Sequence, residues 1–364
     1  MLAESEEREV VEAGPAPEPP AGGLVHVGAD QPGIARRRAG RGWVYLTADR
    51  ARVTDPAVIA RIRALAIPPA WRDVWICDRP DGHIQAIGFD ARGRKQYRYH
   101  ADFRRAREGA KFEHLVTFAE GLPSLRRQVA ADMARPGLGR EKVLATVVQL
   151  LETTMIRVGN AAYARDNDSY GLTTLRRRHV QIEGGALRFE FKGKSGKVWR
   201  LGVRDRRLAR IVKACQDLPG QHLFGYRDGA GALQAITSCD VNAYLKSVTG
   251  RDISAKDFRT WTATVLAAEA LAATEPPPCR KALGGVIKSV AARLGNTPTV
   301  CRASYIHPEI IEAWLTAALT LRPDSEAEGL SATETAVLDF LRRRLTAGGG
   351  AATTPPDRDA RIPA

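Results

Sequence analysis

The spacing of apolar residues changes near residue 107, and this change limits the folds open to the chain. Before it, short apolar runs separated by turn residues are typical of β-strands. After it, apolar residues recur at intervals of three and four, which is typical of amphipathic helices. We therefore predict an α+β protein, with a small β-rich N-terminal domain (residues 24–107) followed by a mainly α-helical domain (residues 108–323). A C-terminal helix and flexible tail are expected over residues 324–364.

The N-terminal half contains three runs with the composition of strands and one stretch with helix signals. Asp55-Pro56 is a good helix start, so we expect a helix from Ala57 to Leu65, ended by Pro68-Pro69. The predicted strands are Trp43–Leu46, Val74–Cys77 and His83–Phe89.

The charge of the chain points to a polyanionic partner. Its 364 residues include 55 Lys+Arg and 41 Asp+Glu, a formal net charge of +14. The first 22 residues hold six glutamates and one arginine, so the remainder carries +19. We interpret residues 1–23, rich in Glu, Pro and Ala, as a disordered acidic leader. The basic remainder favours nucleic acid over membrane, because no apolar run approaches the roughly 20 residues that span a bilayer.

The cysteines and histidines argue against disulfide and metal chemistry. Five cysteines are scattered without C-x-x-C pairing, and no apolar signal segment is found at the N-terminus. We therefore expect reduced thiols and a cytoplasmic protein. The seven histidines show no metal-ligand spacing, so no metal site is expected.

Three helices are predicted directly after residue 107, and the third leads to a candidate anion-binding residue. Their ranges are Lys111–Gly121, Ser124–Met133 and Arg140–Met155, separated at Gly121-Leu-Pro123 and Arg135-Pro-Gly137. Arg157 follows the third helix, which is largely apolar. An arginine that emerges from a buried helix is either snorkelling to solvent or held for an anion.

A three-stranded meander is predicted between residues 172 and 203, with strands His179–Glu183, Leu187–Lys192 and Lys197–Val203. Lys194 lies in its second turn, between Gly193 and Gly196. A lysine in such a turn is usually only solvated, although the glycines leave room for a close approach to another backbone.

Lys256 and Arg259 flank the start of a long apolar helix that runs to Ala273, with Asp257 as its expected N-cap. Backbone N–H groups and the helix dipole already favour an anion at this position. Two cations there are unfavourable unless a ligand supplies negative charge, which favours a phosphate site.

Tyr305 lies near the end of a short helix that two break signals delimit. Gly295-Asn296 is typical of a helix C-cap, and Thr297-Pro298 of an N-cap with proline at the first helical position. We expect this helix to reach His307, before Pro308, with Arg302 on the same face as Tyr305. Taken alone, a tyrosine in this setting is more often a packing residue than a nucleophile.

Basic and aromatic residues alternate between Gln96 and Tyr99, which puts Tyr97 and Tyr99 on one face of a strand and Arg98 on the other. Guanidinium groups can hold phosphates while tyrosines rest on sugars or base edges. A solvated edge strand explains the same pattern equally well.

The helical half contains, in this order, the motifs Arg157-x-Gly, Phe191-x-Gly-Lys194, Lys256-x-x-Arg259-Thr, Leu294-Gly-Asn296-Thr-Pro and Arg302-Ala-Ser-Tyr305. The N-terminal half contains Arg36-Arg-Arg38, Pro68-Pro-Ala-Trp71 and Gly93-Arg-Lys-Gln-Tyr97. In this order the motifs closely resemble those of the bacterial and poxvirus-like type IB DNA topoisomerases, over about residues 24–320.

The resemblance implies a monomer that closes as a clamp around duplex DNA and needs no ATP, metal or other cofactor. It makes Tyr305 the nucleophile that forms a 3′-phosphotyrosyl link. Arg157, Arg259 and Asn296 become phosphate ligands, and Lys194 and Lys256 become donors of the leaving-group proton. The expected DNA contacts are Gln96, Tyr97, Arg98, Tyr99, Tyr163 and Arg302. Such an enzyme is expected in the cytoplasm, associated with the nucleoid.

Two departures from the poxvirus pattern are visible. Asn296 stands where those enzymes carry histidine, so the side chain can donate a hydrogen bond but cannot be charged. Asn160 and Ala162 stand where they carry lysines at the DNA surface, which puts a short pyrimidine-rich target in doubt.

Two rival functions remain open from the sequence. A tyrosine recombinase shares the Arg, Lys, Arg, Tyr plan but usually has His-x-x-Arg in place of Lys256-x-x-Arg259. A DNA-binding protein that keeps only the fold is the non-enzymatic rival.

Overall fold

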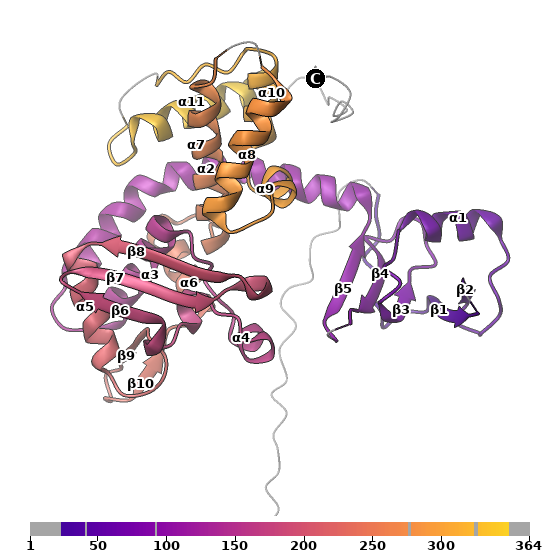
Figure 1. Ribbon diagram of the computed structural model, residues 1–364, viewed down its shortest axis with the longest axis horizontal. Helices are drawn as coiled ribbons and strands as arrows, with labels where there is room; N and C mark the ends of the chain where they lie inside the picture. The colour runs from indigo at the N-terminus through magenta and orange to yellow at the C-terminus, as the bar shows by residue number, and fades with distance from the viewer. Residues whose placement is uncertain (1–22, 41, 92, 276–277, 324–326, 349–364) are drawn as a thin grey trace, which may run out of the picture. The chain divides into compact units, whose positions relative to one another are not determined.

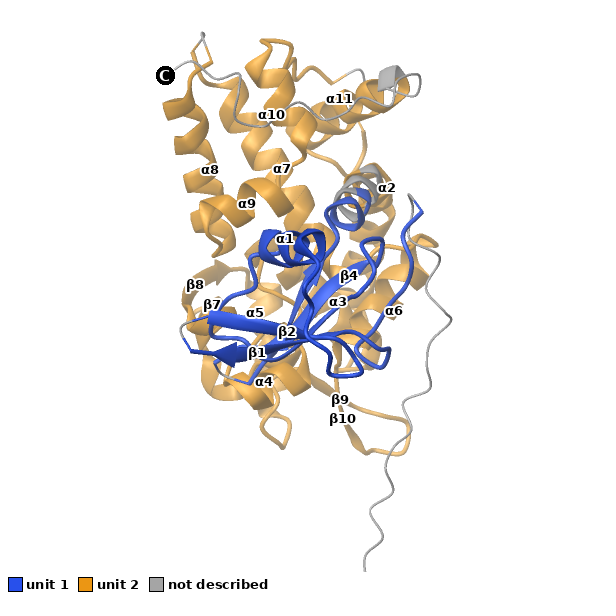
Figure 2. Ribbon diagram, turned by 90° about the vertical axis from the view of Figure 1, so that its right-hand side faces the viewer, with its two compact units in different colours: residues 1–110 blue, residues 111–364 orange. Residues whose placement is uncertain are grey.

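The computed structural model describes residues 23–40, 42–91, 93–275, 278–323 and 327–348. The chain forms two compact units, residues 1–110 and 111–364, which are coloured separately in Figure 2. The first is rich in β-strands and the second is mainly helical, so the predicted α+β class is confirmed. Apart from Gly23, the predicted acidic leader lies outside the described residues, and so does the tail from residue 349.

The first unit is built on a five-stranded antiparallel sheet in the order β2-β1-β3-β4-β5 (Figure 1). One face is covered by α1 (Pro56–Ala64), which Asp55 caps as predicted and whose Ile62 packs on Ile34 and Ile76. The strands are β1 (Ile34–Ala39), β2 (Gly42–Leu46), β3 (Arg72–Ile76), β4 (Ile84–Phe89) and β5 (Lys95–Tyr99).

Strand β1 was not predicted, because three consecutive arginines hide its alternation. Arg36 is nevertheless 8% exposed, since its guanidinium stacks on Trp43 at 4.1 Å from the ring centroid. It also donates to the carbonyls of Ile67, Pro68 and Trp71. Arg36 therefore joins the sheet to the loop that follows α1.

Helix α2 (Ala101–Ala134) is one continuous helix, so the prediction of two helices broken at Pro123 was wrong. A proline inside a helix costs about 3 kcal/mol through a lost hydrogen bond and a steric clash. Ser124 Oγ donates to the Gly121 carbonyl at 2.9 Å, within the turn that contains the proline. The apolar stripe also continues across the proline, with Leu122 and Leu125 both 1% exposed, and its burial outweighs the cost.

The second unit packs helices around α3 (Arg140–Thr154), whose residues Val143–Val148 are all buried. Figure 1 shows the predicted meander, confirmed as an antiparallel sheet in the order β6-β7-β8, against α3 and α5. Its strands are β6 (Val180–Glu183), β7 (Ala186–Lys192) and β8 (Val198–Arg204). A second hairpin, β9 (Gly225–Arg227) and β10 (Leu233–Ala235), was not predicted.

A second group of helices lies around α7, which α8, α10 and α11 all contact. Among the described residues, no helix is long and apolar enough to cross a membrane. The helices of this unit after α3 are α4 (Ala161–Asn167), α5 (Arg206–Asp217), α6 (Ser238–Thr249), α7 (Ala255–Ala272), α8 (Arg280–Leu294), α9 (Pro298–Ser304), α10 (Pro308–Leu315) and α11 (Ala332–Gly348).

Two predicted helix ends need correction. Ser254 is the N-cap of α7, and Asp257 lies at the third helical position, where its carboxylate accepts from the Ser254 backbone N–H at 2.8 Å. Helix α9 ends at Ser304 rather than His307. His307 instead caps the next helix, because its Nδ1 accepts from the Glu309 N–H at 3.2 Å.

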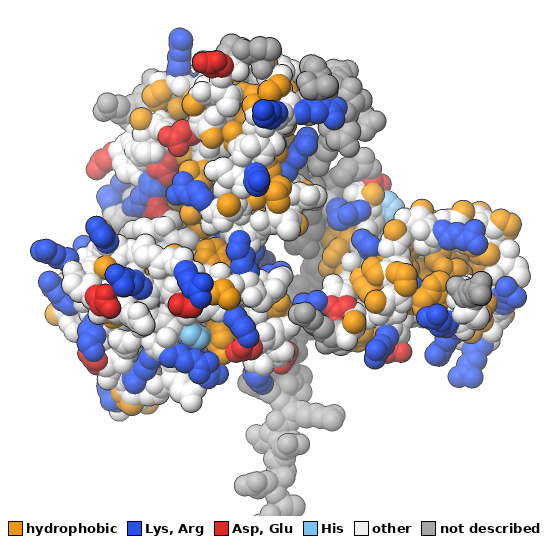
Figure 3. Space-filling model, in the orientation of Figure 1, with side chains coloured by type: hydrophobic (Ala, Val, Ile, Leu, Met, Phe, Trp, Pro, Cys, Tyr) orange, Lys and Arg blue, Asp and Glu red, His pale blue; other side chains and the backbone are white. Residues whose placement is uncertain are grey.

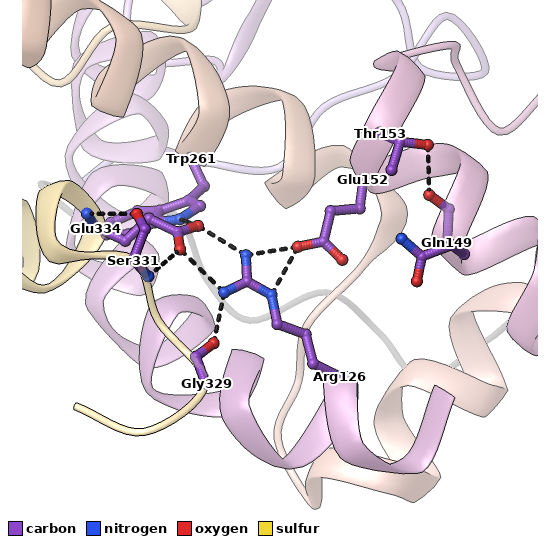
Figure 4. Close-up of polar contacts among 8 residues, drawn as sticks. All are labelled: Arg126, Gln149, Glu152, Thr153, Trp261, Gly329, Ser331 and Glu334. Atoms are coloured by element: carbon purple, nitrogen blue, oxygen red, sulfur yellow. Dashed lines mark hydrogen bonds and ion pairs between the residues drawn. The ribbon is translucent and has the colours of Figure 1, made fainter. Parts of the chain in front are cut away.

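An ionic cluster at the start of the C-terminal helix α11 is drawn in Figure 4. Ser331 and Glu334 form a capping box. Glu334 also receives both Nη atoms of Arg126, at 2.7 and 2.9 Å, and the indole N–H of Trp261 at 3.2 Å. Arg126 reaches Glu152 as well, so the cluster joins α2, α3, α7 and α11.

Candidate active site

Tyr305 is held at the junction between α9 and α10. Gly295 ends α8 with a φ of +68°, and Thr297 caps α9 by accepting from the Val300 N–H, as the sequence predicted. Tyr305 is the C-cap of α9, and its carbonyl accepts from Thr264 Oγ on α7 at 3.2 Å. The nucleophile predicted from sequence is therefore fixed through its backbone to two helices.

Arg157 lies in the loop after α3, which leaves the helix through Met155 in the left-handed conformation. The Arg157 carbonyl accepts from the Leu172 N–H at 2.9 Å, and a Cβ at Gly171 would lie 2.5 Å from the same oxygen. This backbone contact fixes the position of Arg157. Its Nη2 then donates to Asn296 Oδ1 at 2.7 Å, which joins two of the predicted site residues.

Arg259 lies on α7 and is 3% exposed, and its guanidinium reaches the same amide oxygen of Asn296. It donates to the carbonyls of Met155 and Leu294 and, at 3.5 Å, to Asn296 Oδ1. Its guanidinium carbon is 5.2 Å from the Tyr305 ring centroid. Burial and the nearby charge of Arg157 lower the pKa of Arg259 from its usual value.

The charges around Tyr305 favour its ionised form. Burial alone raises the pKa of the phenol, but the charges of Arg259 and Arg157 and polar contacts with Arg259 and Asn296 outweigh it. The net pKa of Tyr305 is therefore lower than the ordinary value of about 10.

Two buried donors in this group have no acceptor in hydrogen-bond geometry among the described residues. They are Nε of Arg259 and Nδ2 of Asn296. A buried donor without an acceptor costs about 1–3 kcal/mol, and an anion bound beside Tyr305 would relieve that cost. Four of the six predicted catalytic residues thus come together as a cationic cluster with spare donors.

The two predicted lysines are placed differently. Lys194 is exposed in the turn between β7 and β8, and Lys256 is exposed at the second position of α7. No hydrogen bond or ion pair described for the chain joins either lysine to Tyr305, Arg157, Arg259 or Asn296.

Lys111 of α2 also belongs to the site, and the sequence did not reveal it. Its Nζ donates to the Ser304 carbonyl and lies 5.1 Å from the Tyr305 ring centroid. The next residue, Phe112, packs its ring on His307 with centroids 5.0 Å apart. A lysine within a helical stretch carries no signal of a partner 193 residues away.

The predicted DNA-contact residues differ in their exposure to solvent and in whether they already form hydrogen bonds within the protein. Tyr97 and Tyr99 are exposed and stacked, with ring centroids 5.8 Å apart, on β5. Arg98 and Gln96 already have partners in their own unit, since Arg98 donates to the Ala66 carbonyl and Gln96 to Asp90. In the second unit, Tyr163 lies on α4 and Arg302 on α9, both half-buried.

Figure 3 shows more Lys and Arg than Asp and Glu side chains over the β7–β8 face.

Comparisons with known proteins identify the family of the chain. The family description "Eukaryotic DNA topoisomerase I, catalytic core" matches residues 100–322, and "Bacterial DNA topoisomerase IB, N-terminal domain" matches residues 42–90. A mimivirus protein named DNA topoisomerase 1B is 33% identical over 293 residues, covering 78% of this chain and 87% of its own length.

Two poxvirus proteins are more distant relatives. DNA topoisomerase 1 of rabbit fibroma virus is 24% identical, covering 62% of this chain and 70% of its own length. DNA topoisomerase 1B of vaccinia virus (strain Copenhagen) is 23% identical, covering 62% and 71%. With a catalytic-core match over more than half of its length and a 33% identical relative, the chain belongs to the type IB DNA topoisomerase family.

Proposed function

We propose that this topoisomerase relaxes supercoiled duplex DNA by cutting and resealing one strand at a time. The Tyr305 oxygen attacks a backbone phosphorus, the bond from phosphorus to the 5′-oxygen breaks, and a 3′-phosphotyrosyl link forms. The freed 5′-hydroxyl later attacks the same phosphorus and expels Tyr305. Each step exchanges one phosphodiester for another of similar energy, so no ATP is needed.

One observation supports this chemistry most directly: Tyr305 lies beside two arginines that lower its pKa. A phenol with a pKa of about 10 is a weak nucleophile at neutral pH, and a cationic pocket makes its anion more accessible. Arg157 and Arg259 bind the non-bridging oxygens, and each such donor contributes about 3–4 kcal/mol of transition-state stabilisation. Nδ2 of Asn296, which is buried without an acceptor in hydrogen-bond geometry among the described residues, supplies a further hydrogen bond to a phosphate oxygen.

The leaving 5′-oxygen needs a proton, and we assign its donation to Lys194 with help from Lys256. Both ammonium groups are exposed in the chain without DNA, so either can turn toward a bound strand. On the return step the same group accepts the proton from the attacking 5′-hydroxyl.

The remaining contacts are proposals of the same kind. Tyr97 and Tyr99 offer exposed aromatic faces to DNA, with Gln96, Arg98, Tyr163 and Arg302 as further contacts. We propose a monomer that closes as a clamp around the duplex and acts in the cytoplasm on nucleoid DNA.

The decisive experiment is relaxation of positively and negatively supercoiled plasmids in EDTA without ATP. We expect relaxation of both, and a covalent protein–DNA adduct that Tyr305→Phe abolishes while duplex affinity stays nearly unchanged. Supercoils of both signs that persist with well-folded protein at modest salt would refute the function. An adduct formed by Tyr305→Phe would move the nucleophile to another residue.

A further inference from the structure

The indole of Trp199, on β8, contacts two glycines that belong to different parts of the site. A Cβ built on Gly193 would lie 2.6 Å from Trp199 Nε1, and one built on Gly295 would lie 2.5 Å from Trp199 Cζ2. Both distances are shorter than non-bonded carbon contacts allow. The indole therefore occupies the space that a side chain would need at either position.

Each of these glycines is next to a predicted catalytic residue. Gly193 precedes Lys194 in the β7–β8 turn, and its φ of −95° is open to any residue. Gly295 ends α8 and precedes Asn296, whose amide oxygen accepts from Arg157. At Gly193 the need for glycine thus comes from the indole alone.

Two backbone hydrogen bonds define the shape of the turn that carries Lys194. The Gly193 N–H donates to the Lys197 carbonyl at 2.8 Å and the Gly196 N–H to the Gly193 carbonyl at 3.0 Å. Such bonds fix the shape of the turn but not its distance from Asn296. The indole of Trp199 is itself packed against β7, because it stacks parallel to the buried Phe191 of that strand, with ring centroids 6.3 Å apart.

We propose that Trp199 is a positioning residue that sets the distance between the Lys194 turn and the cationic cluster of Asn296, Arg157 and Arg259. This inference rests on the proposed function, and in particular on Lys194 as the proton donor. A general acid must come within hydrogen-bond reach of the leaving oxygen, and a misplacement of about 1 Å costs about 100-fold in rate. Trp199 acts through Lys194 and does not itself touch the reacting atoms.

The test uses single-turnover cleavage of a duplex with either an ordinary 5′-bridging oxygen or a bridging sulfur. We expect Trp199→Ala to cleave ordinary DNA about 100-fold more slowly, with duplex affinity unchanged. The sulfur substrate should restore most of that rate, because a thiolate leaves without a proton. Trp199→Phe should recover part of the loss on ordinary DNA. Leu201→Ala is the matched control, since Leu201 lies on the same face of β8 and packs on the core.

Coupling to Lys194 separates this role from a structural one. Adding Trp199→Ala to Lys194→Ala should slow cleavage little further, because both changes impair the same proton transfer. If the double variant loses the product of the two single-variant losses in cleavage rate, the proposal is overturned. It is also overturned if the sulfur substrate does not restore the cleavage rate of Trp199→Ala. If the wild-type protein forms no covalent adduct, the proposed function fails instead.

A second pair of variants keeps the test valid if Trp199→Ala folds poorly. Gly193→Ala places a methyl group where the indole lies, so we expect slower cleavage of ordinary DNA and rescue by sulfur. The double variant Gly193→Ala/Trp199→Ala removes the clash and should cleave no more slowly than Trp199→Ala. Normal cleavage by Gly193→Ala would show that the contact does not position the turn.

Discussion

Asn296 uses both ends of one amide, and this explains how a neutral residue serves a cationic site. Its Oδ1 accepts from Arg157 at 2.7 Å and from Arg259 at 3.5 Å, which keeps two like charges close together. Its Nδ2 has no acceptor in hydrogen-bond geometry among the described residues and remains available to a phosphate oxygen. A protonated histidine at this position would lack the acceptor that joins the two guanidinium groups.

The proton donor can be identified by changing the leaving atom. We expect Lys194→Ala to impair cleavage of ordinary DNA and to be largely rescued by a 5′-bridging sulfur, because a thiolate needs no proton. Arg157→Ala should gain much less, since sulfur leaves the non-bridging oxygens unchanged. Equal rescue of Lys256→Ala would indicate a proton relay, and rescue of Lys194→Ala alone would leave Lys256 a positioning role. Failure to rescue either variant would exclude both lysines as the acid.

His307 makes stability depend on pH at the edge of the site. Burial lowers the pKa of His307 to about 4, compared with about 6.5 in the unfolded chain. The unfolded state therefore binds more protons between these values. The contribution of His307 to the free energy of unfolding is fully present above about pH 6.5. It is lost as pH falls toward about 4, for a total loss of about 3 kcal/mol.

We expect His307→Asn to flatten this dependence, because asparagine can still cap α10 but does not titrate. Urea unfolding of both proteins at several pH values between about 4 and 7 measures the difference. Two curves that fall in parallel would show that His307 is not responsible.

At the scale of elements, one carboxylate of α11 joins that helix to two others. The catalytic-core match ends at residue 322, before α11 begins, yet Glu334 accepts from Arg126 on α2 and Trp261 on α7. Glu334→Gln removes one of the carboxylates that pair with the partly buried Arg126 guanidinium. We therefore expect the free energy of unfolding to fall by about 3 kcal/mol.

The control for Glu334 is an exposed ion pair. Glu190 and Arg200 lie 2.8 Å apart with both side chains more than 60% exposed, so Glu190→Gln should cost less than about 1 kcal/mol. Urea unfolding at neutral pH compares the two variants. Equal losses would mean that the partly buried cluster contributes no more to stability than an exposed ion pair.

The elements also show what could be predicted from sequence. Break signals placed α9 and its start correctly, because Gly295 and Thr297 act through local backbone geometry. The break expected at Pro123 failed, because burial of a long apolar stripe depends on partners elsewhere in the fold. Lys111 and Trp199 were missed for the same reason, since neither carries a local pattern that indicates its distant contacts. The positions of Arg157 and Arg259 at helix ends already marked them as candidate anion ligands, and the family motifs added Asn296.

At the scale of the whole molecule, charge is divided unevenly along the chain. The first 22 residues contribute a formal −5 to a total of +14, so the remainder carries +19. Acidic residues tethered to a basic DNA-binding body compete with phosphates for its cations. That competition acts over a screening length of about 10 Å at 0.1 M salt and weakens as salt rises.

Deleting residues 1–22 should therefore tighten duplex binding at low salt and leave plasmid relaxation unchanged. The gain in affinity should shrink as salt increases, because DNA affinity itself falls with counterion concentration. Fluorescence anisotropy with a labelled duplex across a salt series measures both effects. Replacing the six glutamates of this segment by glutamine is the matched control, since it removes the charge but keeps the length. If the deletion tightens binding and the glutamine variant does not, the cause is excluded volume rather than charge. Weaker binding after deletion would mean that the segment itself contacts DNA.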